Sequence, residues 1–176
     1  TGVIMSVNNS LACDPILKFG TEEQKKKYLV PLASGKALGC FGLTEPGAGS
    51  DAGSQKTTAV RDGDHYVVNG TKRFITNAPQ AGLFTVMART NASDPGAGGV
   101  SAFVVDATSP GISLGKPDRK MGQQGAHTCD VTFEDARVPI TNRLGEEGEG
   151  MKVAMKVLDR GRLHISSLSV GISERL

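Results

Sequence analysis

The residues best suited to chemistry lie in a glycine-rich segment, Leu43–Asp51, that follows a short apolar run. Gly47 and Gly49 allow a backbone with positive φ and a close approach to a ligand. Successive N–H groups in such a turn can form a nest that binds an anion. Thr44 and Ser50 add hydroxyl donors on either side. The segment therefore predicts a ligand-binding loop; the pattern alone leaves open a plain glycine-proline turn at the rim of a sheet.

Two well-known phosphate-binding loops do not fit this segment. The dinucleotide fingerprint requires G-x-G-x-x-G at the start of a crossover helix. Here the third glycine is displaced to Gly53, and a predicted strand, Gln55–Val60, follows instead of a helix. A Walker loop requires a Gly-Lys-Ser/Thr step, which the segment lacks. Both nucleotide-fold interpretations are therefore poor.

The cysteines and histidines do not form a recognisable metal site. Cys13, Cys40 and Cys129 are odd in number and include no C-x-x-C pair, which argues against a disulfide framework or a zinc site. His127 and Cys129 alternate in a predicted strand, but a metal site needs two further ligands that are not nearby. We therefore expect no metal and a reducing compartment.

The first third of the sequence has the pattern of helices. Asp14 followed by a proline predicts a helix cap, and the short helix that it opens is expected to end at Gly20. Thr21 and Gln24 fit the reciprocal capping box of a second helix, which should end near Gly35. After the glycine-rich loop 145–150 the period is helical again, with Met151, Ala154, Met155, Leu158, Arg162 and Ile165 expected on one side.

The middle of the sequence has the two-residue period of strands. The turn Asn69-Gly70, between the runs Tyr66–Asn69 and Lys72–Thr76, predicts a two-residue hairpin. Consecutive strands with short turns favour antiparallel pairing in a sandwich or barrel. The other predicted strands are Leu38–Leu43, Gln55–Val60, Leu83–Ala88, Ser101–Val105, Ile112–Gly115 and Thr128–Glu134.

These patterns predict an α+β fold with a central antiparallel β-barrel or sandwich. We expect the end of an N-terminal helical domain at 1–36, the complete β domain at 37–148, and the first helix of a C-terminal helical bundle at 149–176. Of the 176 residues, 23 are glycine, consistent with many tight turns, and none is tryptophan. A net charge of +2 with scattered basic residues argues against nucleic acid binding, and no apolar run has membrane-spanning length. The ends of the chain fall within periodic sequence, so we expect them to carry no information on targeting.

Four ordered segments resemble the acyl-CoA dehydrogenase family, and they cover essentially the whole chain. Thr44–Asp51 resembles its first signature and Asn69–Asn77 its second flavin segment. Met121-Gly122 followed by Phe133–Pro139 resembles the end of its β domain, and Leu158–Arg162 resembles the start of its C-terminal helical domain. The short-chain members are the most similar. The order of the four motifs favours a ligand-binding loop over a plain turn.

The resemblance implies FAD as cofactor and assigns a role to individual residues. Thr44 would bind the pyrimidine side of the flavin ring, Phe74 would cover one face, and Thr76 would lie near N5, the hydride acceptor. Ser50 would lie where the pyrophosphate and acyl-CoA approach one another. The implied cofactor-binding set is Phe41, Leu43, Thr44, Gly49, Ser50, Phe74, Ile75 and Thr76, and the substrate-binding set is Ser50, Asp159 and Arg162.

The resemblance also implies a carboxylate base that these residues do not supply. In most of the family it is a glutamate far down the C-terminal domain, beyond Leu176 here. In a minority it directly precedes the arginine of the first helix, a position that is Gly161 in this chain. Asp159 lies on another helix face and is interpreted as a partner of Arg162 or of the CoA arm. No catalytic residue is therefore expected within this chain.

The implied function is FAD-dependent α,β-dehydrogenation of acyl-CoA thioesters, with electrons passed to an electron-transfer flavoprotein. An acyl-CoA oxidase, whose flavin reacts with oxygen, and a non-catalytic acyl-CoA-binding module are the alternatives. A homo-oligomer, tetrameric for the full-length protein, in the bacterial cytoplasm or the mitochondrial matrix is implied as well. Without the base and the rest of the bundle, these residues alone are expected to be inactive and to bind FAD weakly or not at all.

Overall fold

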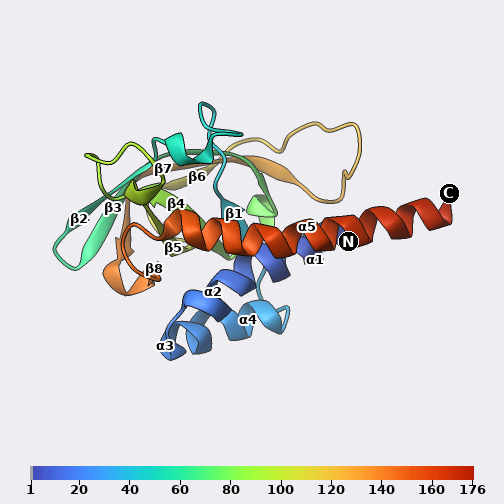
Figure 1. The fold of residues 1–176 in the computed structure, drawn as a ribbon, viewed down its shortest axis with the longest axis horizontal. Helices are drawn as coiled ribbons and strands as arrows, with labels where there is room; N and C mark the ends of the chain where they lie inside the picture. Colours follow the sequence, from blue (N-terminus) through green and yellow to red (C-terminus); the bar gives the residue numbers. More distant parts are fainter. Residues whose placement is uncertain (1) are drawn as a thin grey trace.

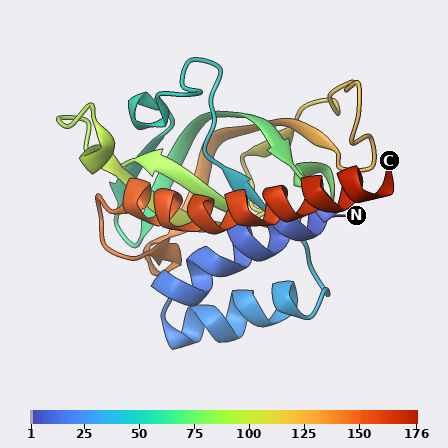
Figure 2. The ribbon, with the colours of Figure 1, turned by 45° about the vertical axis from the view of Figure 1, so that its right-hand side comes forward.

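Helices from the two ends of the chain cover one face of a curved, eight-stranded sheet (Figure 1). The structure is a computed structural model that describes residues 2–176. Helix α5 crosses in front of the sheet, and the N-terminal helices lie beneath it, an arrangement that the rotated view also shows (Figure 2). The observed fold is thus a mixture of helices and one large sheet, as the α+β prediction requires.

The helical elements form three continuous stretches. The first contains α1 (Gly2–Ser6), a wider π-helical segment η1 (Val7–Cys13) and α2 (Asp14–Phe19). The second contains α3 (Glu22–Gln24), a π-helical segment η2 (Lys25–Leu29) and α4 (Val30–Ala33). The third is α5 (Gly150–Arg175). Short 3-10 turns η3 to η6 span Ala52–Ser54, Ala78–Gln80, Ala97–Gly99 and Ile140–Asn142.

The strands are paired in the order β6-β7-β3-β2-β4-β5-β8, with β1 added beside β4. The end strands β6 and β8 do not pair with each other within residues 2–176, so the pairing does not close the sheet into a barrel. Their bounds are β1 Gly39–Gly42, β2 Thr58–Asp62, β3 His65–Thr76, β4 Leu83–Arg89, β5 Val100–Asp106, β6 Ile112–Leu114, β7 Thr128–Pro139 and β8 Arg143–Leu144.

Two of the pairings are parallel, so the expectation of purely antiparallel strands was wrong. Strand β1 runs parallel to β4 over four residue pairs, and β2 meets β4 in parallel at Thr58 and Arg89. Strand β3 precedes β4 in the chain but does not pair with it; β4 pairs with β1, β2 and β5. Short turns indicate antiparallel pairing only for strands that pair with the next strand in sequence.

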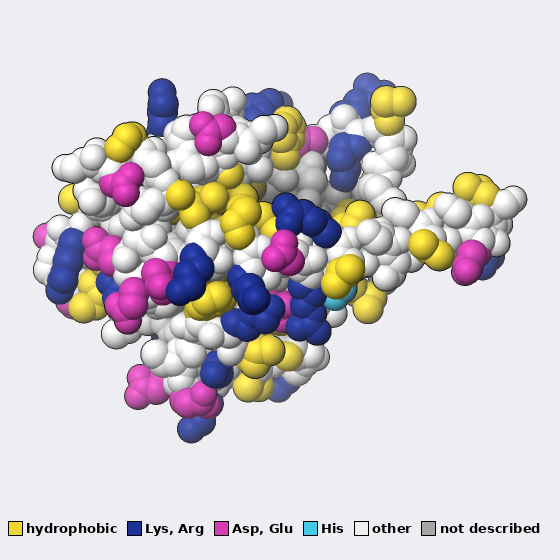
Figure 3. Space-filling view, in the orientation of Figure 1, with side chains coloured by type: hydrophobic (Ala, Val, Ile, Leu, Met, Phe, Trp, Pro, Cys, Tyr) yellow, Lys and Arg dark blue, Asp and Glu magenta, His cyan; other side chains and the backbone are white. Residues whose placement is uncertain are grey.

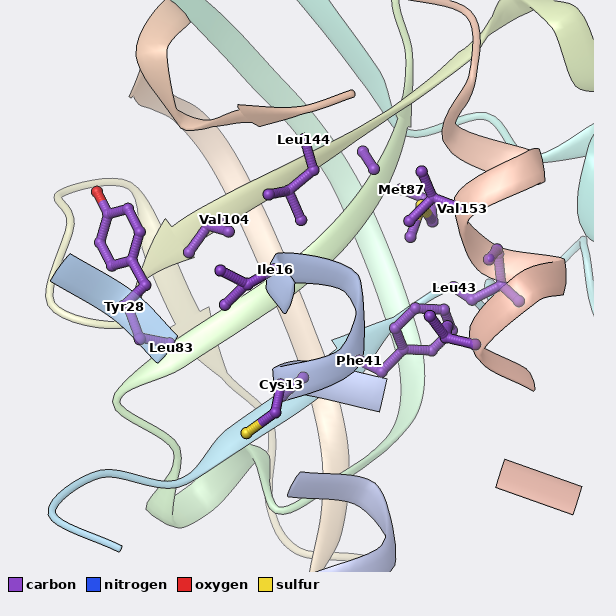
Figure 4. Close-up of a cluster of buried hydrophobic side chains, with 14 of the residues drawn as sticks. Cys13, Ile16, Tyr28, Phe41, Leu43, Leu83, Met87, Val104, Leu144 and Val153 are labelled. Carbon is purple, nitrogen blue, oxygen red and sulfur yellow. The ribbon is translucent and has the colours of Figure 1, made fainter. Parts of the chain in front are cut away.

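Alternating side chains of β4 and β5 enter two separate hydrophobic clusters, one on each face of the sheet. Leu83 and Met87 pack with the helices, whereas Phe84 and Val86 point into a cluster enclosed by the curvature of the sheet. Figure 4 shows the first cluster, where strand side chains meet those of the N-terminal helices and of α5. Both faces of β4 and β5 are therefore buried, and these strands form the rigid centre of the fold.

The prediction that Asp14 caps a new helix was wrong, because the backbone is helical on both sides of it. Cys13 and Asp14 have φ/ψ values of −72°/−47° and −59°/−41°. The buried Asp14 carboxylate instead binds Lys18 and Arg160 of α5, at 3.3 Å and 3.1 Å. Asp14 therefore does not cap a helix; it joins two helices that are distant in sequence.

The capping box at Thr21 is confirmed. The Gln24 backbone N–H donates to the Thr21 hydroxyl at 3.2 Å, and the Thr21 backbone N–H donates to the Gln24 side chain at 2.9 Å. The Gln24 amide also donates to the carbonyls of Thr141 and Arg143. The same side chain therefore begins the helix and joins it to the segment around β8.

The predicted hairpin at Asn69-Gly70 was wrong, because β3 runs without a turn from His65 to Thr76. The actual turn between β2 and β3 contains Gly63, with φ 61°. Gly70 is needed for space, since a Cβ there would overlap the Thr57 side chain and lie 2.7 Å from its Cα. The register against β7 also shifts between Val68 and Gly70. Glycine thus marks a bulge with a close backbone approach.

The residues that α5 buries differ from those predicted and lie on an adjacent side of the helix. Its buried residues are Gly150, Val153, Ala154, Val157 and Gly161. Of the predicted face only Ala154 is fully buried, because small residues here let the helix approach the sheet and η1 closely. The last turns of α5 extend beyond the sheet and beyond α1 (Figures 1 and 3). The second half of the helix exposes apolar side chains such as Leu163 and Val170.

Candidate functional site

A cavity of about 210 Å³ lies where β1, the end of β3, the N-terminal helix and α5 meet. It brings together six of the eight predicted cofactor-binding residues. Figure 4 shows Phe41 and Leu43 next to each other near α5. The six residues are Phe41, Leu43, Thr44, Phe74, Ile75 and Thr76.

Backbone pairing explains why two segments about thirty residues apart form one wall. The N–H of Arg73 donates to the Thr44 carbonyl at 2.8 Å, which joins the segment after β1 to β3. Phe41 and Leu43 share a face because side chains alternate along a strand. The order of aromatic, apolar and hydroxyl residues along the cavity therefore follows from the pairing of two extended segments.

A bulge in β3 turns Phe74 outward. In a regular strand Lys72 and Ile75 would point to opposite faces, yet both are buried. The register against β7 shifts between these two residues, and Phe74 takes φ 60°. Such a backbone in a bulky residue costs about 1–3 kcal/mol and persists only where the surroundings enforce it. The ring is 57% exposed at the mouth of the cavity and lies 4.9 Å from the Arg73 guanidinium.

The other predicted residues lie outside this cavity. Gly49 and Ser50 belong to the exposed loop between β1 and β2. Asp159 and Arg162 form an exposed ion pair at 2.7 Å on α5, and Arg162 lines a separate cavity of about 420 Å³ between η1 and α5. Within residues 2–176, no carboxylate lines the 210 Å³ cavity.

The alternative base position, Gly161, faces the N-terminal helix at close range. A Cβ at this position would lie 3.4 Å from the Ser10 hydroxyl and 3.5 Å from a Leu11 methyl carbon. Glycine therefore contributes to the approach of the two helices. A Cβ at this position would be in ordinary van der Waals contact with both neighbours.

Three further residues line the cavity: Val7, Leu11 and Leu158. The sequence placed Leu158 on the packed side of the last helix but not in the site, and it gave no role to Val7 and Leu11. All three are aliphatic and lie on helices, so their types give no sign of chemistry. Val7 and Leu11 are four residues apart and share a helix face, and this spacing was the only available signal. They close the cavity on the side opposite the strands and reduce its exposure to water.

A buried ionic network supports the cavity wall from behind. The ammonium of Lys72, fully buried, donates to Glu45 Oε1 and Gln55 Oε1, each at 2.7 Å, and to the Leu43 carbonyl at 3.2 Å. The Glu45 carboxylate also accepts the backbone N–H groups of Lys56 and Thr57, at 2.6 Å and 3.0 Å. The network ties β3 to both ends of the glycine-rich loop and so sets where Leu43 and Thr44 lie.

The network shifts the ionisation of both charged members. Burial lowers the pKa of Lys72 to about 8, although the Glu45 charge and hydrogen bond oppose this. Burial raises the pKa of Glu45, but the Lys72 charge and the hydrogen bonds from Lys72, Thr57 and Lys56 outweigh it, so this pKa is lowered from 4.5. Glu45 is thus held as a carboxylate.

Acid should weaken the folded state through Glu45. Because its pKa is lower when folded than when unfolded, its stabilising contribution is complete above pH 4.5 and is lost as the pH falls below that value. We expect the free energy of unfolding, measured with urea between pH 6 and pH 3, to fall more steeply in the wild type than in Glu45→Gln. Equal slopes in the two proteins would contradict this assignment.

Residues 2–176 contain neither a candidate metal site nor a candidate membrane span. No group of three or more His, Cys, Asp or Glu side chains is placed to hold a metal ion there. No helix in that range is long and apolar enough to cross a membrane. The three cysteines are free and buried.

Comparison with known proteins identifies the family. Residues 40–136 match the acyl-CoA dehydrogenase middle domain, and residues 1–36 match the N-terminal domain of the same family. The match to the middle domain alone spans more than half of the chain. The chain therefore belongs to the acyl-CoA dehydrogenase family.

The similar proteins are much longer than this chain. The human mitochondrial short-chain specific acyl-CoA dehydrogenase is 51% identical over 174 residues, which are 99% of this chain and 42% of that protein. The caffeyl-CoA reductase-Etf complex subunit CarC of Acetobacterium woodii is 51% identical over 98% of this chain and 45% of its own length. The structure of butyryl-CoA dehydrogenase from Megasphaera elsdenii superposes with a TM-score of 0.95 at 46% identity, covering 98% of this chain and 45% of that one. The chain thus spans less than half the length of these relatives.

Proposed function

We propose that this chain forms part of the flavin site of an oxidoreductase that dehydrogenates acyl-CoA thioesters between the α and β carbons. The observation that carries the proposal is the 210 Å³ cavity, in which apolar walls and two threonine hydroxyls converge. Neither the Thr44 nor the Thr76 hydroxyl forms a hydrogen bond within residues 2–176, although both are only partly exposed. They are therefore free to bind polar atoms of a ligand.

The residues present fit a flavin ring in type. A ring system needs a flat apolar wall, which Phe41, Leu43 and Leu158 supply, and donors at its heteroatoms, which Thr44 and Thr76 supply. Drug-sized ligands occupy roughly 300–1,000 Å³, so this cavity is suited to a ring system rather than to a whole dinucleotide. The exposed Gly49 and Ser50 are available to the remaining, anionic part of the cofactor and to acyl-CoA.

Each residue would contribute by binding, orienting or excluding water. FAD, when bound, supplies an acceptor for the hydride that leaves the β carbon. The Thr76 hydroxyl would donate a hydrogen bond near N5, and Thr44 would donate on the pyrimidine side, where reduction places negative charge. Val7 and Leu11 would keep the opposite side dry. Phe74 would cover the exposed ring face, and Asp159 with Arg162 would bind the CoA arm.

The α-proton needs a base from outside these residues. A carboxylate is the expected group, and none within residues 2–176 lines the cavity. The proposal therefore includes a glutamate supplied by further sequence, and inactivity of residues 1–176 alone. The same proposal includes a division into domains at residues 37 and 149. It also includes a homo-oligomer, located in the bacterial cytoplasm or in mitochondria. The Etf complex named for the Acetobacterium woodii relative supports an electron-transfer flavoprotein as partner.

The test uses a protein of the relatives' length that contains this chain. Under anaerobic conditions, a short acyl-CoA should bleach the flavin absorbance, and Thr76→Val should slow the bleaching by about tenfold to a hundredfold because one donor to the reduced ring is lost. Thr58→Val, at the start of β2 and away from the cavity, is the matched control. Absence of bound flavin, or equal rates in Thr76→Val and the wild type, would refute the proposal.

A further inference from the structure

The side chain of Arg89, the last residue of β4, is surrounded by backbone carbonyl groups of two loops. Its five N–H donors make five hydrogen bonds, with Nε at 3.2 Å from one acceptor and Nη2 at 2.8 Å and 3.0 Å from two others. Nη1 donates to the remaining two. The acceptors are the carbonyl oxygens of Gly53 and Gln55 in the β1–β2 loop, and of Asp94, Pro95 and Gly96 in the β4–β5 loop.

Only the geometry of arginine satisfies this arrangement. A guanidinium carries five donors in a rigid plane, whereas an ammonium carries three. Arg89 forms no ion pair with a carboxylate within residues 2–176, so its charge is balanced there by carbonyl dipoles. Gly99 provides the room, because a Cβ at that position would overlap Arg89 Nη1. The group is thus fitted to hold two loops together.

Gln55 links this group to the ionic network behind the cavity. Its backbone carbonyl accepts from Arg89, and its side-chain oxygen accepts from Lys72 at 2.7 Å. Its side-chain amide donates back to the Ala52 carbonyl at 3.0 Å. Two cations therefore fix one residue from two directions, and Gln55 is itself 1% exposed.

At the tip of the same loop, only Ala48 is buried, and its backbone pairs with Glu45 through hydrogen bonds of 3.0 Å and 3.2 Å. A Cβ placed on Gly49 would meet no atom within 4 Å, and Ser50 and Asp51 are exposed. The position of Gly49 and Ser50 therefore depends on the segments on either side of them. Glu45 holds the first end through Lys72, and Arg89 holds the second through Gly53 and Gln55.

We propose that Arg89 is a positioning residue that locks the second half of the β1–β2 loop onto the β4–β5 loop and so sets the place of Gly49 and Ser50. The functional part of this inference rests on the proposed flavin and acyl-CoA site. The positioning itself does not, because it concerns contacts within the chain. Arg89 lies outside the cavity and is not expected to touch cofactor or substrate.

Hydrogen–deuterium exchange of the protein without added flavin tests the positioning. Loss of two of the five hydrogen bonds in Arg89→Lys should speed amide exchange about tenfold in residues 51–55 and in residues 93–97 together, with β3 and β7 unchanged. Arg137→Lys is the matched control, because its ion pair with Asp62 is exposed. Faster exchange confined to residues 93–97, or none in either loop, would overturn the proposal.

Chemical rescue separates a specific guanidinium role from a general loss of stability. In Arg89→Ala, millimolar guanidinium should restore slow exchange in residues 51–55, whereas ammonium at equal ionic strength should not. Equal effects of the two ions, or no rescue in a variant whose β3 and β7 amides remain protected, would overturn the proposal.

Flavin binding in a protein of the relatives' length separates this inference from the proposed function. We expect Arg89→Lys to raise the dissociation constant for FAD about tenfold while the rate of flavin bleaching at saturating FAD stays near the wild-type value. Unchanged FAD affinity beside faster loop exchange would refute the functional role of Arg89. A wild-type protein that takes up no flavin would refute the proposed function, and the exchange data would still decide the positioning.

Discussion

Replacement of Lys72 by methionine should destabilise the folded protein by about 3–5 kcal/mol, because it leaves the Glu45 carboxylate buried without its cation. Methionine keeps the length of the side chain and its packing, so the loss reports mainly on charge and hydrogen bonds. Lys72 is fully buried and Glu45 is 7% exposed. Three acceptors lose their donor at once. Urea unfolding at pH 7 measures the change.

Two companion variants make this result specific. Lys72→Met combined with Glu45→Gln removes the unpaired charge, and should recover at least about 1 kcal/mol relative to Lys72→Met alone. Lys25→Met, which breaks the exposed Lys25–Glu22 pair, should unfold close to the wild type. A Lys72→Met protein as stable as Lys25→Met would show that the network contributes little to folding.

Gly70→Ala should lower the free energy of unfolding by about 2–4 kcal/mol through two independent effects. The backbone at Gly70 has φ 144°, which side chains rarely adopt. The added Cβ would also lie 2.7 Å from the Thr57 Cα and 2.8 Å from its Cβ, so β3 and the β1–β2 loop would have to separate. Urea unfolding of the variant beside the wild type measures the loss.

The matched control for this variant is Gly47→Ala. A Cβ at Gly47 would meet no atom within 4 Å, so the stability should change little. The contrast also distinguishes the observed bulge from the hairpin that the sequence predicts. If Gly70 lay in an open hairpin turn, Gly70→Ala would be strained by its φ alone and would not disturb residues 55–57. Amide exchange at Thr57 that stays at the wild-type rate would therefore count against the close approach of Gly70 to Thr57.

Elements with a strong local signal were predictable from the sequence. The capping box at Thr21 depends on residues three positions apart, and it forms as expected. The strands that became β1, β4, β5 and β6 have the predicted positions to within a residue or two, because alternation of apolar residues is itself local. The two halves of the cavity wall, Phe41–Thr44 and Phe74–Thr76, were also identified, through resemblance rather than through periodicity.

Elements that depend on distant partners were not predictable. Asp14 has the local pattern of a cap, but its carboxylate binds Arg160, almost 150 positions away in the sequence. Asn69-Gly70 has the pattern of a turn, but Asn69 exchanges hydrogen bonds with Asp135 of β7, which keeps β3 extended. In both cases a long-range contact outweighs a local preference, since local preferences are worth only about 1 kcal/mol.

The sequence by itself determined the types of the elements, the glycine-rich loop, the family resemblance and the list of candidate flavin contacts. Only the tertiary structure decided that six of those contacts share a cavity, that Val7, Leu11 and Leu158 close it, and that Gly49 and Ser50 stand apart. It also revealed Lys72 and Arg89 as the two cations that fix the loop. The physical reason is that a side-chain cation acts through the oxygens around it, and those oxygens come from segments that are distant in sequence and meet only when the sheet curves and the helices cover it.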